Sequence, residues 1–456
     1  MCSFAKYIKH KLLKYLPYYK RNLKLALPIV LSQAGQVIVQ QVDTMMVGYV
    51  GTTDLAAAAF ANSIFVIGLV IVMGFTFGIT PAVGLAFNNK NNKYLQSLLV
   101  NAHVLNISFA ILISALLYGI SFTFPYMGQN EEVWKLSQPY FFTLIASLLP
   151  LIIFFTNKQF AEGIGNTKKA MYVTISSNII NVIFNYILIF GKFGAPELGL
   201  LGAGISTLIS RIYMAVMFVA IFKYGETFKD YYSSLKLEYI DKIAIRKLFS
   251  LGMPIATQIV LEVSAFAFTA VMAGWLGVIP LAANQIATGL SSISFMIVVG
   301  IGAATTIRVS HQMSEKDYNG LLMAAKASIH IVLAFMAITA STFLILRGIL
   351  PRFYTQDEAV IILASQMLIA AAIFQLFDGL QAVMISILRG FGDVKPAMKY
   401  SFIAYILINL PVGYFLAFTL EMGLKGLWIG FIVGLAAAAF MFYFRFRKLV
   451  KKLGIL

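Results

Sequence analysis

The sequence predicts an all-α polytopic membrane protein, with twelve transmembrane helices in two pseudo-symmetric six-helix bundles. Three observations favour this class. The 456 residues are 60% hydrophobic and 12% charged, with a mean hydropathy of +0.85, which is too apolar for one water-soluble core. Apolar windows of helical length recur along the whole chain, and the second half of the chain repeats the first. A transmembrane β-barrel would instead show alternating segments of about ten residues.

Each apolar window is long enough for a helix to cross a hydrocarbon layer about 30 Å thick. In chain order the twelve predicted spans are residues 24–47, 56–82, 95–122, 136–158, 170–192, 200–223, 247–275, 281–308, 321–346, 359–387, 397–420 and 426–445. Because the number of spans is even, both termini are expected on the same side of the membrane.

The 35 Lys and Arg residues are distributed unevenly between the two predicted sides of the membrane. With the N-terminus inside, 28 of them lie in inside segments and five in outside loops, while Arg211 and Lys326 lie within spans. Cytoplasmic loops are enriched in these residues. The pattern predicts a multi-pass protein of the cytoplasmic (inner) membrane with cytoplasmic N- and C-termini. The net charge of +17 is then a topology signal and does not indicate a nucleic-acid partner.

The two ends of the chain are basic. Residues 1–23 are predicted to form an N-terminal interfacial segment, since "KYIKHKLLKYLPYYKRNLK" suits a helix that meets anionic lipid of the bilayer. Residues 446–456 are predicted to form a basic cytoplasmic tail. No cleavable signal peptide is expected, because the first apolar run is too long. The single cysteine, Cys2, cannot form an internal disulfide.

The internal repeat divides the chain into two lobes. A shift of 226 residues aligns Pro28 with Pro254 and Gly74 with Gly300; shifts of 227 and 224 align "GIGNTKKAM" (163–171) with "GFGDVKPAM" (390–398), and Gly199 and Gly202 with Gly423 and Gly426. Six spans per half make the repeat parallel, with a pseudo-twofold axis along the membrane normal and a ligand path between the lobes. We therefore predict an N-lobe (24–223), a cytoplasmic linker (224–246) and a C-lobe (247–445).

Three of the 18 acidic residues lie within predicted spans: Asp43, Glu262 and Asp378. A charge at the centre of a span costs about 2.5–3.5 kcal/mol on insertion-based scales. Such a residue therefore normally faces a cavity or a partner. These three acids are the first candidates for a functional site.

Polar side chains accompany the acids at helical spacing. Gln33, Gln36 and Gln40 share a stripe with Asp43, and Asn178, Asn181 and Asn185 form a stripe in the fifth span. In the second half, Gln258 lies one turn from Glu262, Gln375 lies one turn from Asp378, and Asn284 begins a stripe in the eighth span. Isolated membrane Asn and Gln residues often join helices to one another. Together with the acids, they indicate a polar cavity lining in each lobe.

Two ion chemistries fit these residues. A hard cation such as Na+ needs several oxygen ligands, which Asp43 with Asn181, Asn185 and Thr207 would supply if they pack together. Proton coupling needs only a carboxyl group that burial makes easier to protonate. The residues leave the choice between Na+ and H+ open.

Other chemistries leave no motif. The sequence contains no GxxxxGK[ST] loop, so neither nucleotide hydrolysis nor a partner ATPase subunit is expected. Its four histidines lack HExxH or equivalent spacing, so we predict no transition-metal site. We expect no cofactor and no enzymatic activity.

The combination of motifs resembles the multidrug and toxic compound extrusion (MATE) family, and most closely its bacterial NorM-like branch. The resemblance rests on twelve spans in two halves, on "PIVLSQAGQVIVQQVDTMMVG" with Pro28 fifteen residues before Asp43, and on "MPIATQIVLEVSAF" and "FQLFDGLQAV" around Glu262 and Asp378. It implies export of organic cations or drugs, mostly cationic and amphipathic, in exchange for inward Na+ or H+. We expect a functional monomer.

The resemblance also implies residue roles. Asp43 would bind the coupling ion in the N-lobe, with Asn181, Asn185 and Thr207 nearby. Glu262 and Asp378 would form the C-lobe cation site, and Pro28 would mark a bend in the first helix. In one departure, Phe374 stands one turn before Asp378, where some relatives are expected to carry a Tyr that helps to hold the cation.

Three alternative functions have weaker support in the sequence. A flippase for lipid-linked saccharides has the same twelve-span plan but needs a basic cavity for a pyrophosphate, which acidic spans disfavour. A polytopic membrane enzyme would need a catalytic cluster such as paired histidines. A channel would not need two symmetric halves, but the sequence does not exclude one.

Overall fold

The computed structural model describes residues 2–88, 92–232 and 239–454, and every regular element in these ranges is a helix. The helices are α1 (Cys2–Gly48), α2 (Thr52–Thr76), α3 (Ile79–Phe87), α4 (Asn92–Ser121), α5 (Glu131–Gly163), α6 (Lys168–Ile189), α7 (Gly199–Tyr224), α8 (Lys242–Trp275), α9 (Val278–Ser314), α10 (Tyr318–Leu346), α11 (Glu358–Gly390), α12 (Val394–Phe402), α13 (Leu410–Tyr414) and α14 (Leu424–Lys452). Short 3-10 turns are η1 (Phe124–Tyr126), η2 (Lys192–Gly194) and η4 (Leu350–Phe353), and the π-helical segments are η5 (Ile403–Asn409) and η6 (Phe415–Thr419).

The prediction of twelve spans is confirmed, because the described residues contain twelve helices long and apolar enough to cross a membrane. Helices α2 and α3 together make the second span, and residues Val394–Thr419 make the eleventh. Most helices are longer than the apolar windows: the first span begins at Lys14 and the last ends at Lys452. An apolar window marks only the residues that favour hydrocarbon, whereas a helix continues as far as its backbone bonds do.

The chain folds into two compact units, and two helices contribute to both. Unit 1 comprises Met1–Val30 and Thr257–Leu456, and unit 2 comprises Leu31–Ala256. The two crossing points are 226 residues apart, and each follows a buried proline, Pro28 in α1 and Pro254 in α8. The predicted division at residues 224–246 stays a prediction, because these units are divided within α1 and α8.

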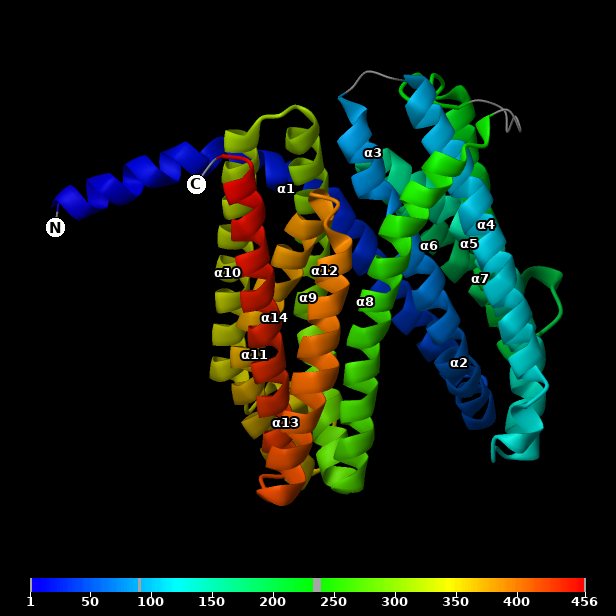
Figure 1. The fold of residues 1–456 in the computed structure, drawn as a ribbon. Helices are drawn as coiled ribbons and strands as arrows, with labels where there is room; N and C mark the ends of the chain where they lie inside the picture. The colour runs from blue at the N-terminus through cyan, green and yellow to red at the C-terminus, as the bar shows by residue number, and fades with distance from the viewer. Residues whose placement is uncertain (1, 89–91, 233–238, 455–456) are drawn as a thin grey trace. The chain divides into compact units, whose positions relative to one another are not determined.

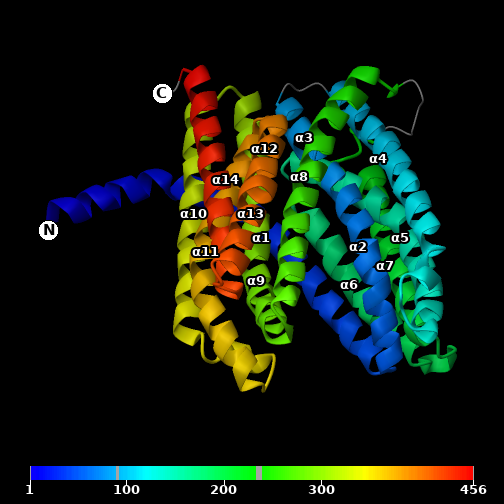
Figure 2. The same ribbon diagram turned by 60° about the horizontal axis from the view of Figure 1, so that its bottom comes forward.

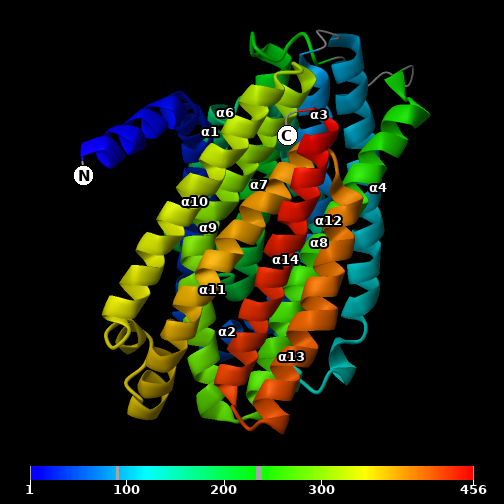
Figure 3. The same cartoon turned by 60° about the vertical axis from the view of Figure 1, so that its left-hand side comes forward.

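In unit 1, α11 lies between α9 and α14, and α10 lies alongside it (Figures 1 and 3). The first part of α1 joins this bundle through Asn22, whose Nδ2 donates to the carbonyl of Ala324 (3.1 Å) and to Oγ of Ser328 (2.8 Å). Before these contacts, the N-terminal end of α1 projects away from α10 and α14 (Figure 1). The basic segment predicted at residues 1–23 is therefore helical, and its first turns extend from the bundle.

The eleventh span is widened into π-helix over Ile403–Asn409, just before Pro411. Proline has no backbone N–H and its ring clashes with the carbonyl four residues earlier, so a regular α-helix is disfavoured at this point. The wider turn relieves the clash and rotates the side chains that precede it. Tyr405, fully buried, lies in this segment.

In unit 2, α5 packs against α2, α4 and α7 (Figure 2). Small residues allow the closest approaches: a Cβ on Gly202 of α7 would lie 2.6 Å from the carbonyl oxygen of Leu188 on α6. The repeat partner Gly426 does the same in unit 1, where a Cβ would lie 2.5 Å from the backbone nitrogen of Ala417. The glycines matched at a shift of 224 thus perform the same packing task in each unit.

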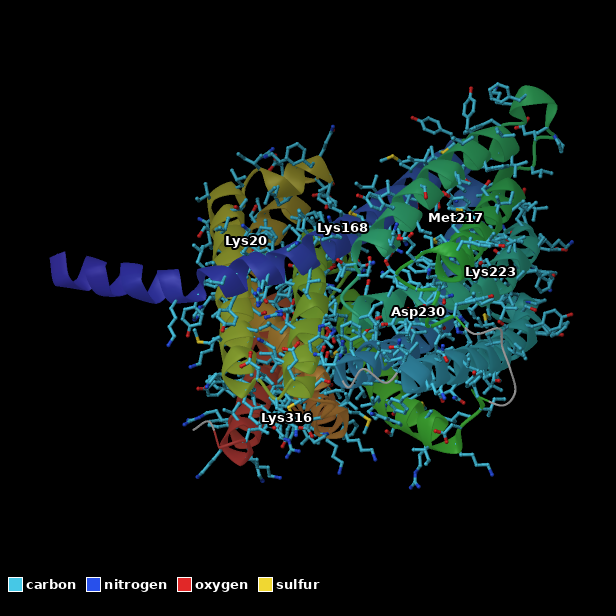
Figure 4. All side chains as sticks on the ribbon, turned by 90° about the horizontal axis from the view of Figure 1, so that it is seen from above. Lys20, Lys168, Met217, Lys223, Asp230 and Lys316 are labelled. Carbon is cyan, nitrogen blue, oxygen red and sulfur yellow. The ribbon has the colours of Figure 1, made fainter. Side chains whose placement is uncertain are left out.

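One end of unit 1 carries basic side chains. Figure 4 looks onto this end, where Lys20 of α1 and Lys316, between α9 and α10, are labelled. Near them Arg308 of α9 interacts electrostatically with Arg21 of α1 and with Asp317. In unit 2, Lys168, Lys223 and Asp230 are labelled at helix ends or in connections in the same figure. Charged groups gather at helix ends, as the hydropathy pattern predicts.

Candidate functional site

In unit 2, Asp43 of α1 meets the asparagine stripe of α6. Nδ2 of Asn185 donates to Oδ1 of Asp43 at 2.5 Å and to Oδ1 of Asn181 at 3.3 Å. Asn181 and Asn185 are 3% and 0% exposed, and Asp43 is half-buried. The one-turn spacing on α6 points both amides to the same side, so the structure brings together three of the four predicted N-lobe residues.

A buried arginine accompanies this carboxylate. Arg211 of α7 donates from Nη1 to Oγ of Ser147 at 2.6 Å, and its guanidinium lies 5.4 Å from the ring centroid of Phe65. Arg211 and Asp43 attract each other electrostatically, and both interact with the hydroxyl group of Tyr140. We call Asp43, Tyr140, Asn181, Asn185 and Arg211 the Asp43 cluster. One carboxylate and one guanidinium give it a formal charge of zero.

The fourth predicted N-lobe residue, Thr207, lies on α7 one turn before Arg211 and is half-buried. Its carbonyl accepts a hydrogen bond from Oγ of Ser210 at 2.9 Å. Asn178 lies beside α1, because a Cβ on Gly35 would come within 2.8 Å of its Nδ2. Of the three predicted lining glutamines of α1, Gln33 and Gln36 are half-buried and Gln40 is exposed.

In unit 1, Glu262 of α8 is connected to a second buried arginine. Nε2 of Gln258 donates to Oε2 of Glu262 at 2.8 Å, and Nη2 of Arg389, on α11, donates to Oε1 of the same glutamine amide. Glu262 and Arg389 attract each other electrostatically. The Gln258 amide therefore bridges an anion and a cation that make no direct ion pair, and it fixes α8 against α11.

Asp378 and Tyr405 complete this group. Asp378 of α11 is 4% exposed and interacts electrostatically with Glu262. Tyr405 interacts with Glu262, Asp378 and Arg389, and its hydroxyl group is buried without a hydrogen-bond partner among the described residues. We call Gln258, Glu262, Asp378, Arg389 and Tyr405 the Glu262 cluster. Two carboxylates and one guanidinium give it a formal charge of −1, unlike the Asp43 cluster.

Two predicted lining residues of the second half are engaged in helix-to-helix bonds. Oε1 of Gln375 accepts from Ser294 (2.6 Å) and Thr339 (3.0 Å). Oδ1 of Asn284 accepts from the indole N–H of Trp428 at 3.2 Å. These bonds fit the interpretation that membrane amides join helices, and they draw α9, α10, α11 and α14 together.

Phe374 lies on the apolar side of α11. Its ring packs against Trp428 and Phe431, with centroid distances of 5.4 and 5.8 Å, and it is 2% exposed. The position therefore contributes no oxygen to the Glu262 cluster. In the part of the chain that the structure describes, no three His, Cys, Asp or Glu side chains come together as metal ligands. Any further cation ligand in either cluster must be a hydroxyl, an amide or a backbone carbonyl.

Comparison with known proteins adds the family. The MatE family model matches the chain twice, over residues 28–187 and 254–415. The chain belongs to the MatE family. The two matches begin 226 residues apart, which is the shift of the internal repeat, so each half of this MATE-family chain carries one copy of the family unit.

Curated relatives and solved structures agree with this family. The chain is 33% identical to "Multidrug resistance protein NorM" of Vibrio vulnificus, over 92% of this chain and 93% of the relative. It is 31% identical to "Multidrug resistance protein MdtK" of Photorhabdus laumondii, over 95% and 96%. A solved structure of a mutant of the Vibrio cholerae MATE transporter VcmN superposes with a TM-score of 0.88 at 18% identity, over 96% of this chain and 98% of that one. The last likeness supports the fold.

Sequence reasoning missed two residues of the Glu262 cluster. The hydropathy pattern places Arg389 in an inside loop, but α11 continues to Gly390 and encloses it. A signal is present in the sequence, because Arg389 follows Asp378 by eleven residues and thus lies on nearly the same helix face. Tyr405 gives no such signal, since the π-helical turn that directs its side chain is not visible in a hydropathy pattern.

Proposed function

We propose that this MATE-family chain is a secondary multidrug efflux transporter that exports cationic, amphipathic compounds by alternating access, in exchange for inward Na+ or H+. The observation that supports it best is the presence of one carboxylate cluster within the membrane helices of each unit. Buried carboxylates are costly in a bilayer and mark ion or proton pathways. The printed names of its relatives, "Multidrug resistance protein NorM" and "MdtK", support the same substrate class.

The clusters suggest how ion entry drives export. A carboxylate exposed to the outside attracts a cation, and once neutralised it costs less to enclose between packed helices. Release of the ion inside restores the charge and reverses the preference. Asp43, with Asn181, Asn185 and Thr207, is proposed as the ion-responsive site of one unit, and Glu262 with Asp378 as that of the other.

The substrate class follows from charge and aromatic content. Acidic groups in the membrane interior attract cationic drugs by complementarity, and the 38 Phe residues of the chain offer apolar surfaces and cation–π contacts. The predicted cavity-lining amides, among them Gln33, Gln36 and Asn178, would hydrogen-bond polar parts of the drug. We propose Pro28 as the bend point of α1, because α1 passes from unit 1 to unit 2 just after it.

A flippase for lipid-linked saccharides is less well supported. The helices enclose Arg308 and Arg389 in addition to Arg211 and Lys326. However, Arg211 and Arg389 both face carboxylates, and Arg308 lies at the charged end of α9. A pyrophosphate would meet no free basic group in either cluster.

The topology is proposed from the charge pattern. Both termini and the linker at residues 224–246 would lie in the cytoplasm, with the chain in the inner membrane. The first turns of α1 would rest on anionic lipid. We propose that the transporter acts as a monomer and needs neither a cofactor nor an ATPase subunit.

Transport in reconstituted proteoliposomes tests this function. An imposed inward Na+ or H+ gradient should drive export of a cationic drug, and Asp43→Asn should abolish it. Glu358→Gln, which removes an exposed partner of Arg352, is the matched control and should export at the wild-type rate. Export unchanged in Asp43→Asn, or a conductance that does not depend on any gradient, would contradict the proposal.

A further inference from the structure

The Glu262 cluster has a charge that its own residues do not balance. Glu262 and Asp378 each carry a carboxylate, whereas Arg389 is the cluster's single cation. Asp378 is 4% exposed and Gln258 is 2% exposed, so little solvent reaches the group. An unbalanced charge in such surroundings costs several kcal/mol, which a bound monovalent cation would offset.

The cluster also contains a hydroxyl that the protein leaves unpaired. Tyr405 is fully buried, and its oxygen has no hydrogen-bond partner among the described residues. Buried polar atoms are nearly always paired, so an exception calls for a reason. The π-helical turn before Pro411 directs this side chain at the charged groups, since Tyr405 interacts electrostatically with Glu262, Asp378 and Arg389 together. π-Helical turns occur often at functional sites.

We propose that Tyr405 supplies the hydroxyl ligand of a single Na+ ion held by Glu262 and Asp378, and that Arg389 is the resident counter-charge that limits the site to one monovalent cation. This inference rests on the proposed antiport function and names a ligand and a charge-setting residue for it. The tyrosine hydroxyl from η5 would take the role that Phe374 of α11 has no oxygen to fill.

The ligand chemistry favours Na+ over a proton at this site. A proton needs one carboxylate oxygen and would leave the Tyr405 hydroxyl without a stronger partner. Hard cations bind several oxygen ligands at once, from carboxylates, hydroxyls or carbonyls. A phenol hydroxyl has free lone pairs for a cation while its proton is donated to a neighbouring carboxylate. Two carboxylates and one hydroxyl thus use every anionic group and the unpaired oxygen of the cluster.

Arg389 sets the charge that the site accepts. Its Nη2 bond to Gln258 keeps it one amide away from Glu262, so it reduces the net negative charge without occupying the carboxylate. With Arg389 present, one Na+ brings the cluster to zero, whereas a divalent ion would leave one positive charge in a buried site. The arrangement therefore selects against divalent ions by charge.

Tyr405→Phe tests the proposal because it removes one oxygen and keeps the ring. Tyr400→Phe is the matched control, since Tyr400 lies on α12 of the same span, is half-buried and packs against Phe442. Two measurements on the full-length protein are needed: the melting temperature in detergent with NaCl replaced stepwise by choline chloride, and the Na+ dependence of drug export from proteoliposomes.

For Tyr405→Phe we expect the half-saturating Na+ concentration for export to rise at least about fivefold, and the Na+-induced rise in melting temperature to shrink. Without Na+ the variant should melt at the wild-type temperature or higher, since it no longer buries an unpaired hydroxyl. Tyr400→Phe should match the wild type in each measurement. Ligands that bind only the folded state raise its stability, so both readouts follow the same affinity.

Three results would overturn the inference. The first is a wild-type Na+ dependence of export in Tyr405→Phe. The second is a melting temperature of that variant lowered by the same amount with and without Na+, as a packing role predicts, and the third is a wild-type melting temperature that Na+ leaves unchanged. Each of these leaves the antiport proposal intact if a proton gradient still drives export and Asp43→Asn still abolishes it. Failure of the Asp43→Asn test would instead contradict the proposed function itself.

Discussion

The two units share one repeat but differ in the charges that they enclose. The Asp43 cluster pairs one carboxylate with Arg211, while the Glu262 cluster sets two carboxylates against Arg389. The cation-bearing positions are not repeat partners. At a shift of 227, Arg389 corresponds to Glu162 of α5, which is 3% exposed and lies 3.9 Å from Lys158. The repeat has kept the scaffold and changed the chemistry.

The same shift explains how each arginine is held or excluded. Ser147, which accepts the Arg211 bond, corresponds to Phe374, which lies in an aromatic group. One unit therefore has a hydroxyl to hold a guanidinium where the other has an apolar wall. The difference implies that a cation is drawn more strongly to the Glu262 cluster, whereas neutralising Asp43 leaves Arg211 uncompensated.

The largest expected effect comes from removing charge in the Glu262 cluster. Glu262→Gln or Asp378→Asn brings its formal charge to zero and should raise the half-saturating Na+ concentration for export by more than about tenfold, because breaking a buried charge interaction costs about 2–5 kcal/mol. The double variant Glu262→Gln/Arg389→Gln restores the charge of −1 and should recover part of the Na+ dependence. Equal loss in the single and double variants would argue against charge as the controlling quantity.

A smaller effect is expected from Arg211→Gln, which gives the Asp43 cluster a charge of −1 and makes the two clusters alike. The half-saturating Na+ or H+ concentration for export should fall about fivefold, as for about 1 kcal/mol of lost attraction. Arg445→Gln is the control, since Arg445 pairs with Asp393 away from both clusters. If Arg211→Gln leaves the ion dependence of export at the wild-type value, the Asp43 cluster is not limited by its arginine.

The smallest effects concern what the units have in common. Gly202→Ala and Gly426→Ala each place a Cβ within 2.6 Å of backbone atoms, and each should lower the free energy of unfolding by about 1–3 kcal/mol. Gly119→Ala of α4 is the control, because a Cβ there meets nothing within 4 Å, and it should be neutral or stabilising by about 0.5–1 kcal/mol. Thermal unfolding measures all three variants. A large difference between Gly202→Ala and Gly426→Ala would show that the shared scaffold is unequal.

Much of the architecture could be predicted from the sequence, because hydropathy and glycine positions act over short distances along the chain. The twelve spans, the repeat and the approach of Asp43 to Asn181 and Asn185 follow from helical periodicity. The exchange of helix ends between units, with Val30 and Ala256 as the last residues before each crossing, depends on packing between distant segments. Periodicity carries no information about such packing.

The missed site residues have a similar explanation. A hydropathy window ends where charge begins, so Arg389 falls outside its predicted span even though the helix and its bond to Gln258 enclose it. The direction of Tyr405 depends on a π-helical turn, which changes the residue period that sequence patterns assume. Functional groups at such irregular points need the three-dimensional structure.

Counting bound Na+ tests the central claim most directly. Radioactive sodium binding to the purified full-length protein, at fixed pH, should reach one ion per molecule in the wild type and in Asp43→Asn, and none in Asp378→Asn. This result is expected if only the Glu262 cluster has an uncompensated negative charge. Two ions per wild-type molecule, or loss of binding in Asp43→Asn with retention in Asp378→Asn, would contradict the account.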